Sequence, residues 1–167
     1  MKRFKIAIIF FFFVCISFSQ SKEWNSYDLD SIVTLDMPFE VYEIDTIINN
    51  RKHYEIFSDN DSITFYAKRS FLGKAYSNVE SLTLPNDQES LTEFYSDLTW
   101  FITEGNKNEL ARSIPIKYHN LKGYKLIFKN KSGLHIQELN LVLANKNLYS
   151  FSYTNINGLK EEEKNLF

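Results

Sequence analysis

The side chains with the most obvious capacity for chemistry in this 167-residue chain are its three histidines, His53, His119 and His135. A metal site would need them to converge in space with a carboxylate such as Glu55 or Glu138, because imidazole and carboxylate groups together bind zinc and similar ions. No two of the histidines are within helical reach of each other. We therefore interpret them as three surface histidines and predict no metal site.

Motifs with a known catalytic mechanism are missing from the sequence. It has no Gly-x-Ser-x-Gly elbow, no His-Glu-x-x-His, and, with five scattered glycines, no phosphate-binding glycine loop. The sequence therefore predicts no catalytic residue and no cofactor. A hydrolase that uses only carboxylates leaves no local signature, and it stays open as an alternative.

Two short patterns could indicate a ligand or a modification. Residues 59–62 resemble the start of a calcium loop, but they lack the glycine at the sixth position and the glutamate at the twelfth, and we predict a hairpin turn instead. Three Asp-Ser/Thr-Ile triplets resemble the O-glycosylation signal of exported proteins in some Gram-negative bacteria. This pattern is short and common, and we interpret it as chance. The triplets are Asp30-Ser31-Ile32, Asp45-Thr46-Ile47 and Asp61-Ser62-Ile63.

The first 19 residues have the pattern of a secretory signal peptide. Basic Lys2, Arg3 and Lys5 precede an uninterrupted apolar run, residues 6–16, which is shorter than the roughly 20 residues of a membrane-spanning helix. Small residues then stand at the −3 and −1 positions of a cut after Ser19. We therefore expect an exported protein, periplasmic or extracellular, that does not span the membrane once it is processed.

Removal of residues 1–19 changes the overall composition. The whole chain has a formal net charge of −2, and without the three basic residues of the signal it keeps 16 Lys+Arg against 21 Asp+Glu, a net charge of −5. Cys15, the one cysteine, also leaves with the signal, so disulfides, thiol nucleophiles and cysteine-bound zinc are excluded. The acidic balance argues against nucleic-acid binding, and we interpret the lysines between 122 and 131 as a solvated strand face.

The remaining chain, residues 20–167, is predicted to be a single α+β domain. Four segments of period-2 alternation predict strands before residue 72: 32–37, 41–48, 52–57 and 62–71. Four more predict strands in the second half: 114–118, 124–129, 134–143 and 149–153. The turns between them are rich in Asn and Asp. We expect an antiparallel sheet of about seven to eight strands.

Two helices are expected to pack on this sheet. Apolar residues recur at three- and four-residue spacing from Leu91 to Ile102, with a capping box at Asn86/Glu89 or Ser90/Glu93 and Gly105 just past the end, in a positive-φ conformation. A second, C-terminal helix is predicted for 158–167. In the strand 134–143 the apolar phase changes, which predicts a β-bulge near Gln137-Glu138.

One arrangement of residues resembles a known family. The Trp24…Tyr27 pair, a strand that ends in Met37-Pro38, Leu84-Pro85 before the helix, Gly123-Tyr124, and the Leu148–Phe151 segment before a C-terminal helix resemble the PsbP-like fold. This resemblance implies an antiparallel sheet between helices and mostly non-catalytic accessory or binding roles. It assigns no functional residue.

The sequence therefore favours a non-enzymatic, exported accessory or binding domain whose partner is a protein or a small ligand. The sequence assigns no ligand-binding residue. A carrier of a small apolar ligand, built as a lipocalin-like closed barrel, is the second hypothesis. A large dry cavity lined by Tyr42, Phe65, Tyr124 and Phe151 would support the carrier. Two buried carboxylates meeting in a cleft would support the hydrolase.

Overall fold

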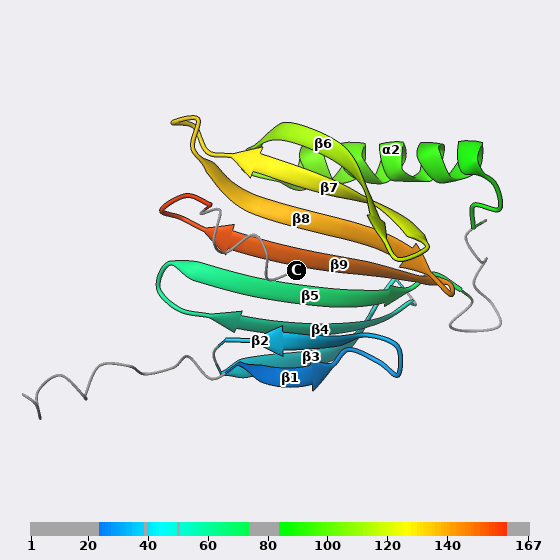
Figure 1. Ribbon diagram of the computed structural model, residues 1–167, viewed down its shortest axis with the longest axis horizontal. Helices are drawn as coiled ribbons and strands as arrows, with labels where there is room; N and C mark the ends of the chain where they lie inside the picture. Colours follow the sequence, from blue (N-terminus) through cyan, green and yellow to red (C-terminus); the bar gives the residue numbers. More distant parts are fainter. Residues whose placement is uncertain (1–23, 39, 50, 74–83, 160–167) are drawn as a thin grey trace, which may run out of the picture.

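A computed structural model describes residues 24–38, 40–49, 51–73 and 84–159, which form two antiparallel sheets and a helix (Figure 1). The strands are β1 Asn25–Asp28, β2 Thr34–Met37, β3 Val41–Ile48, β4 Arg51–Asp59, β5 Ile63–Phe71, β6 Glu109–Tyr118, β7 Leu121–Lys129, β8 His135–Ala144 and β9 Asn147–Asn155, and the helix α2 is Gln88–Gly105. The large sheet has the order β3-β4-β5-β9-β8-β7-β6, and β1 pairs with β2.

The predicted antiparallel sheet with a mid-chain helix is confirmed, but its strand count is wrong. Seven strands form the large sheet, and a separate two-stranded sheet contains β1, which has no alternating apolar pattern to predict it. The predicted C-terminal helix lies outside the described residues except for Gly158 and Leu159, which are not helical. The large sheet is open, with β3 and β6 at its edges, so the described strands do not form a lipocalin-like closed barrel.

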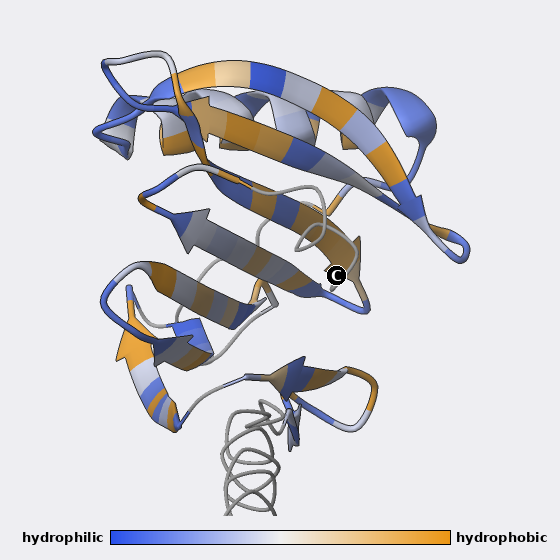
Figure 2. Cartoon of the chain, turned by 60° about the vertical axis from the view of Figure 1, so that its left-hand side comes forward, coloured by the Kyte–Doolittle hydropathy of each residue, from blue (hydrophilic) through white to orange (hydrophobic). Residues whose placement is uncertain are grey.

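The β1–β2 hairpin packs on one face of the large sheet, which we call the hairpin face. Leu29 and Met37 of the hairpin are buried there, and burial of one such side chain is worth about 1.5–3 kcal/mol. Trp24 packs edge-on against Phe65, with ring centroids 5.7 Å apart. The large sheet contributes Ile56, Phe65, Ala67, Ala144, Tyr149 and Tyr153 to this cluster. Figure 2 shows that hydrophobic and hydrophilic residues alternate along the strands.

Helix α2 packs on the opposite face, which we call the helix face. Its apolar side chains Leu91, Phe94, Leu98 and Ile102 surround the fully buried Tyr95 and contact Leu126, Phe128, Leu139 and Leu141 of the sheet. The Tyr95 hydroxyl donates to the Lys122 carbonyl at 2.9 Å and accepts from the Leu143 N–H at 2.8 Å. These bonds anchor the helix over β7 and β8.

Both ends of α2 correct the prediction. Asp87 caps the N-terminus: its carboxylate accepts from the Ser90 N–H at 2.8 Å and the Ser90 hydroxyl at 2.7 Å, so neither predicted pair, Asn86/Glu89 or Ser90/Glu93, is the capping box. Gly105 is the last helical residue and does not have a positive φ. The chain instead leaves the helix through Asn106 in an extended conformation, which any residue adopts.

The predictions of a hairpin turn and of a β-bulge agree with the structure. Asn60 Oδ1 accepts from the N–H groups of Ser62 and Ile63, which confirms the hairpin turn predicted at 59–62. The pairing of β7 with β8 steps from Gln137 to His135, so Ile136 is an extra residue beside the predicted bulge position. The predicted β-bulge is therefore confirmed.

The two covering elements lie over different halves of the large sheet as well as on opposite faces. Figure 1 places β1 and β2 beside β3 and β4, whereas α2 lies beside β6 and β7. Of the described elements, the hairpin therefore lies toward the β3 edge of the hairpin face. Helix α2 lies toward the β6 edge of the helix face. A hollow lies beside each covering element, one at the edge of the hairpin and one beside α2.

Candidate functional site

The structure places the three histidines on different elements. His53 lies in β4 and contacts the Ser70 hydroxyl at 2.9 Å, His119 is in the β6–β7 turn, and His135 begins β8. The pKa of His53 is lowered by burial and by the nearby Lys68 ammonium. No group of three or more His, Cys, Asp or Glu that could hold a metal ion occurs in the described part of the chain.

The carboxylates with the least exposure do not form a catalytic pair. Glu138 is buried on β8, where the Lys125 ammonium is 2.5 Å from its Oε1 and the Asn140 amide donates to the same oxygen at 3.3 Å. Asp30 is part-buried in the β1–β2 turn and has a separate set of partners. The two groups share no partner among the described residues, so they do not form a carboxylate pair there.

The four residues expected to line a carrier cavity lie on two faces. Phe65 and Phe151 pack in the cluster of the hairpin face, whereas Tyr124 packs against Tyr95 under α2, with the two rings tilted and their centroids 5.0 Å apart. Tyr42 stacks on Phe57 at the β3 edge. These side chains therefore do not enclose one cavity.

An apolar pocket of about 310 Å³ lies on the hairpin face, at the edge of the β1–β2 hairpin. We call it the hairpin pocket. Apart from Thr34 and His119, all of its lining residues are aliphatic or aromatic, and its volume falls at the lower end of the range of roughly 300–1,000 Å³ for small-molecule sites. It is lined by Ile32, Val33, Thr34, Leu35, Tyr118, His119, Leu121, Val142, Ala144, Tyr149 and Phe151.

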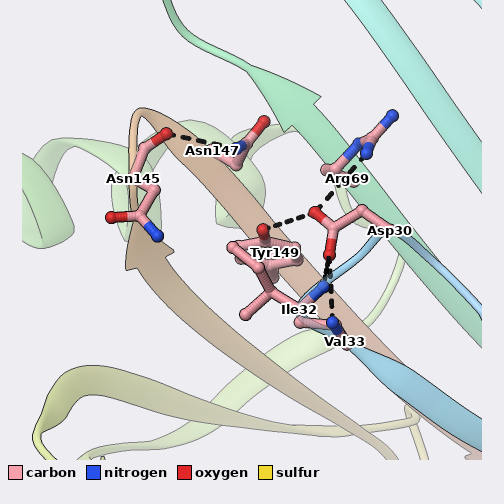
Figure 3. A network of polar contacts seen from close by, with 7 residues as sticks. All are labelled: Asp30, Ile32, Val33, Arg69, Asn145, Asn147 and Tyr149. Carbon is pink, nitrogen blue, oxygen red and sulfur yellow. Dashed lines mark hydrogen bonds and ion pairs between the residues drawn. The ribbon is translucent and has the colours of Figure 1, made fainter.

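The hairpin wall of this pocket is held to the sheet by Asp30 (Figure 3). One carboxylate oxygen accepts from the N–H groups of Ile32 and Val33, at 2.8 and 2.9 Å, and so closes the β1–β2 turn. The other accepts from the Tyr149 hydroxyl at 2.7 Å and is 3.4 Å from the Arg69 guanidinium. A single side chain therefore joins the turn to β5 and β9.

The pKa values in this network follow from these contacts. Burial by itself raises the pKa of Asp30, but the hydrogen bonds from Tyr149, from the Ile32 and Val33 N–H groups and from Arg69 outweigh it, and the pKa stays below its usual 3.8. Burial, together with the bond to Asp30 and its charge, raises the pKa of Tyr149 to about 12. At neutral pH an ionised carboxylate therefore accepts from a protonated phenol.

The opposite wall comes from the β6–β7 turn and the end of β8. His119 has a φ of 50°, in the left-handed region, and this tight turn brings Tyr118 and Leu121 to the same side of the pocket. Burial raises the pKa of Tyr118, and the Glu138 carboxylate raises it further. The floor is formed by Val142 and Ala144 of β8, next to Tyr149.

A second hollow, of about 440 Å³, lies on the helix face beside Ile102 of α2. Its chemistry differs, because β5 and β9 line it with hydroxyl side chains in two facing rows: Thr64, Tyr66, Ser150, Ser152 and Thr154. The Lys68–Glu55 ion pair, at 2.6 Å, lies on the same face. Burial and the nearby Glu55 raise the pKa of Tyr66. The hairpin pocket is the more apolar of the two sites.

The sequence did not single out the hairpin pocket. In the sequence Asp30 belongs to an Asp-Ser/Thr-Ile triplet, although Asp is also a residue that closes tight turns by accepting from N–H groups two and three positions ahead. In the other triplets, Thr46 lies in β3 and Ser62 precedes β5. The pocket itself has no local signature, since its lining comes from five strands and two turns.

Comparison of this chain with protein-family models, with curated proteins and with solved structures finds no match. The PsbP-like resemblance therefore stays a prediction. Among the described residues, no helix is both long and apolar enough to span a membrane. The predicted signal peptide, residues 1–19, lies outside the described residues.

Proposed function

We propose that the chain is an exported binding domain that takes a small apolar group into the hairpin pocket. The observation that supports this function is the pocket lining, in which nine of the eleven residues are aliphatic or aromatic. Apolar surface of this kind favours a ligand by about 25 cal/mol per Å² removed from water. The fitting ligand is a short aliphatic chain or a single ring.

The chemistry around the pocket favours binding over catalysis. The titratable groups nearest the hairpin wall, Asp30 and Tyr149, are both engaged in bonds that hold the hairpin. A ligand in this pocket would therefore meet mostly apolar side chains, together with the bonded phenol of Tyr149 and the side chains of Thr34, Tyr118 and His119. Export is proposed from the sequence, on the basic, apolar and small-residue pattern of residues 1–19.

Titration of the purified protein with n-alkanols of increasing length, by calorimetry, tests the binding function. Each methylene that enters the pocket contributes about 0.8 kcal/mol, so the affinity rises roughly fourfold per carbon until the pocket is full and then levels off. An affinity that does not depend on chain length would refute the proposal.

Two matched pairs of variants locate the binding. Ile32 is 60% exposed and lines the pocket, whereas Ile156 is 59% exposed and does not, so Ile32→Gln lowers the alkanol affinity roughly fivefold and Ile156→Gln leaves it unchanged. Ala144→Leu fills the pocket floor and abolishes binding, whereas Ala111→Leu, on β6 outside the pocket, does not. Equal effects within either pair contradict the assigned site.

The intact mass of the same protein, purified from the cell envelope or medium, tests export. We expect a mass that lacks residues 1–19. A mass that retains them contradicts cleavage at Ser19, and an added mass of sugar contradicts the interpretation of the Asp-Ser/Thr-Ile triplets as chance.

A further inference from the structure

The edge strand β3 has the features of a site for strand addition. It pairs with β4 along all eight residues from Val41 to Ile48, and its other side has no strand partner among the described residues. Four of its side chains are large, apolar and exposed: Tyr42 at 50%, Ile44 at 43%, Ile47 at 51% and Ile48 at 47%. A long edge strand that exposes large apolar side chains is a template for pairing with another chain.

The opposite edge of the same sheet, β6, has features that protect an edge strand from pairing with another chain. Strand β6 has a register shift between Leu110 and Arg112, a proline at Pro115, and cationic side chains at Arg112 and Lys117. Bulges, prolines and charges of this kind are the usual devices that keep an edge strand from pairing. β3 has a continuous register, no proline, and no Lys or Arg. Of the two edges of this sheet, β3 is therefore the one that favours pairing with a strand of another chain.

The register shows which backbone groups are free. Ile48 pairs with Arg51 across a two-residue connection, and such a closing pair exchanges both of its backbone hydrogen bonds. The bonded pairs then alternate along the ladder, so the N–H and C=O groups of Ile44 and Thr46 point to β4. Those of Val41, Glu43, Asp45 and Ile47 point outward from the sheet.

The side chains of β3 define the chemistry of a partner strand. Glu43 and Asp45 lie on one face and are exposed, and neither forms an ion pair within the described part of the chain; Glu43 accepts only the Tyr54 hydroxyl, at 2.6 Å. Tyr42, Ile44 and Ile48 lie on the other face. A complementary strand carries basic side chains on the first face and apolar ones on the second.

We propose that β3 binds an extended segment of another protein in which basic and apolar residues alternate, by adding it as an eighth strand to the large sheet. The backbone groups of β3 supply the hydrogen bonds, and Glu43 and Asp45 select the positive charge. This site is separate from the hairpin pocket and does not depend on it.

The test uses a blocked nine-residue peptide of alternating Val and Lys with Thr at both ends, titrated into the full chain by calorimetry. We expect saturable binding, and chemical-shift changes in the amides of Val41, Glu43, Asp45 and Ile47. Two control peptides do not bind: one with Glu in place of every Lys, and one with N-methyl groups on alternate amides. Binding of either control as tightly as the test peptide overturns the proposal.

Variants at Asp45 separate the contribution of the backbone hydrogen bonds to the peptide affinity from that of the charge. Asp45→Pro removes an outward N–H, which an edge strand tolerates, and lowers the affinity at least tenfold while the circular dichroism spectrum and melting temperature stay those of the parent. Asp45→Lys lowers the affinity about fivefold at low salt, and the difference disappears at high salt. Asp97→Lys, the same charge change on the exposed side of α2, has no effect.

Three further outcomes of these experiments also test the proposal. If Asp45→Pro does not fold, Asp45→Lys and the N-methylated peptide still test both parts of the proposal. Unchanged peptide affinity in Asp45→Lys at low salt overturns the charge selection. A chain that dimerises with concentration, and stops doing so in Asp45→Lys or Asp45→Pro, shows that the occupant is a second copy and overturns the assignment of a basic partner.

Discussion

Replacement of Tyr149 by Phe is the sharpest test of how the hairpin is attached. The substitution removes one oxygen and keeps the ring that lines the pocket, so packing is conserved. The lost bond, of 2.7 Å to the Asp30 carboxylate, is to a charged group, and such bonds contribute about 1.5–3 kcal/mol. Because Asp30 keeps its bonds to Ile32 and Val33, we expect a loss near the lower end, about 1.5–2 kcal/mol.

The loss of unfolding free energy in Tyr149→Phe depends on pH, and the contacts of Asp30 determine the direction of this dependence. The pKa of Asp30 is lowered in the folded protein, so its charge stabilises the fold above its unfolded value of 3.8 and this contribution is lost as the pH falls through the folded pKa. Tyr149 is the largest of the groups that lower this pKa. The gap in unfolding free energy between parent and Tyr149→Phe is therefore widest at neutral pH and narrows below pH 3.8.

Urea unfolding followed by tryptophan fluorescence measures both effects. Tyr124→Phe is the control, since its hydroxyl has no hydrogen-bond partner among the described residues, and it changes the unfolding free energy by less than about 0.5 kcal/mol. In an Asp30→Asn background the cost of Tyr149→Phe falls by at least half. A cost that is the same in both backgrounds, or a gap that does not narrow in acid, would refute the reasoning.

Two further variants test buried polar contacts elsewhere. Tyr95→Phe leaves the Leu143 N–H and the Lys122 carbonyl without their partner, so we expect a loss of about 2–4 kcal/mol in urea unfolding and faster amide exchange at Leu143; normal exchange there contradicts this role. Lys125→Met leaves the buried Glu138 carboxylate without its cation and destabilises the fold by about 3 kcal/mol, most of which the added substitution Glu138→Gln restores; a double variant no more stable than Lys125→Met argues against the ion pair.

The strands were predictable because their signal is local. In β3, alternation from Val41 to Ile48 gave the bounds of the strand, and in β8 the change of phase near Gln137 predicted the bulge that Ile136 forms. A period of two residues can be recognised within one segment, without knowledge of the partner strand. Strand β1 was not predictable from its sequence, because Tyr27 is the only large apolar residue among its four.

The start of α2 shows where local signals become ambiguous. Asn86, Asp87 and Ser90 are all good N-cap residues within five positions, and two of them have an acidic residue three positions ahead. The structure selects Asp87, whose extended backbone lets its carboxylate reach both the N–H and the hydroxyl of Ser90. The choice depends on how the chain enters the helix, which the residue types do not specify.

The sequence by itself determined most elements of this protein: the period-2 strands, the amphipathic helix and the Asn turns. Only the tertiary structure decided where the functional surfaces lie. Asp30 meets Tyr149 across 119 positions of the chain, and that contact sets the hairpin to one side of the sheet and leaves a pocket beside it. Likewise, β9 joins β5 to β8 in one sheet, which leaves β3 and β6 as its two edges. Both outcomes rest on long-range pairing, which no window of neighbouring residues contains.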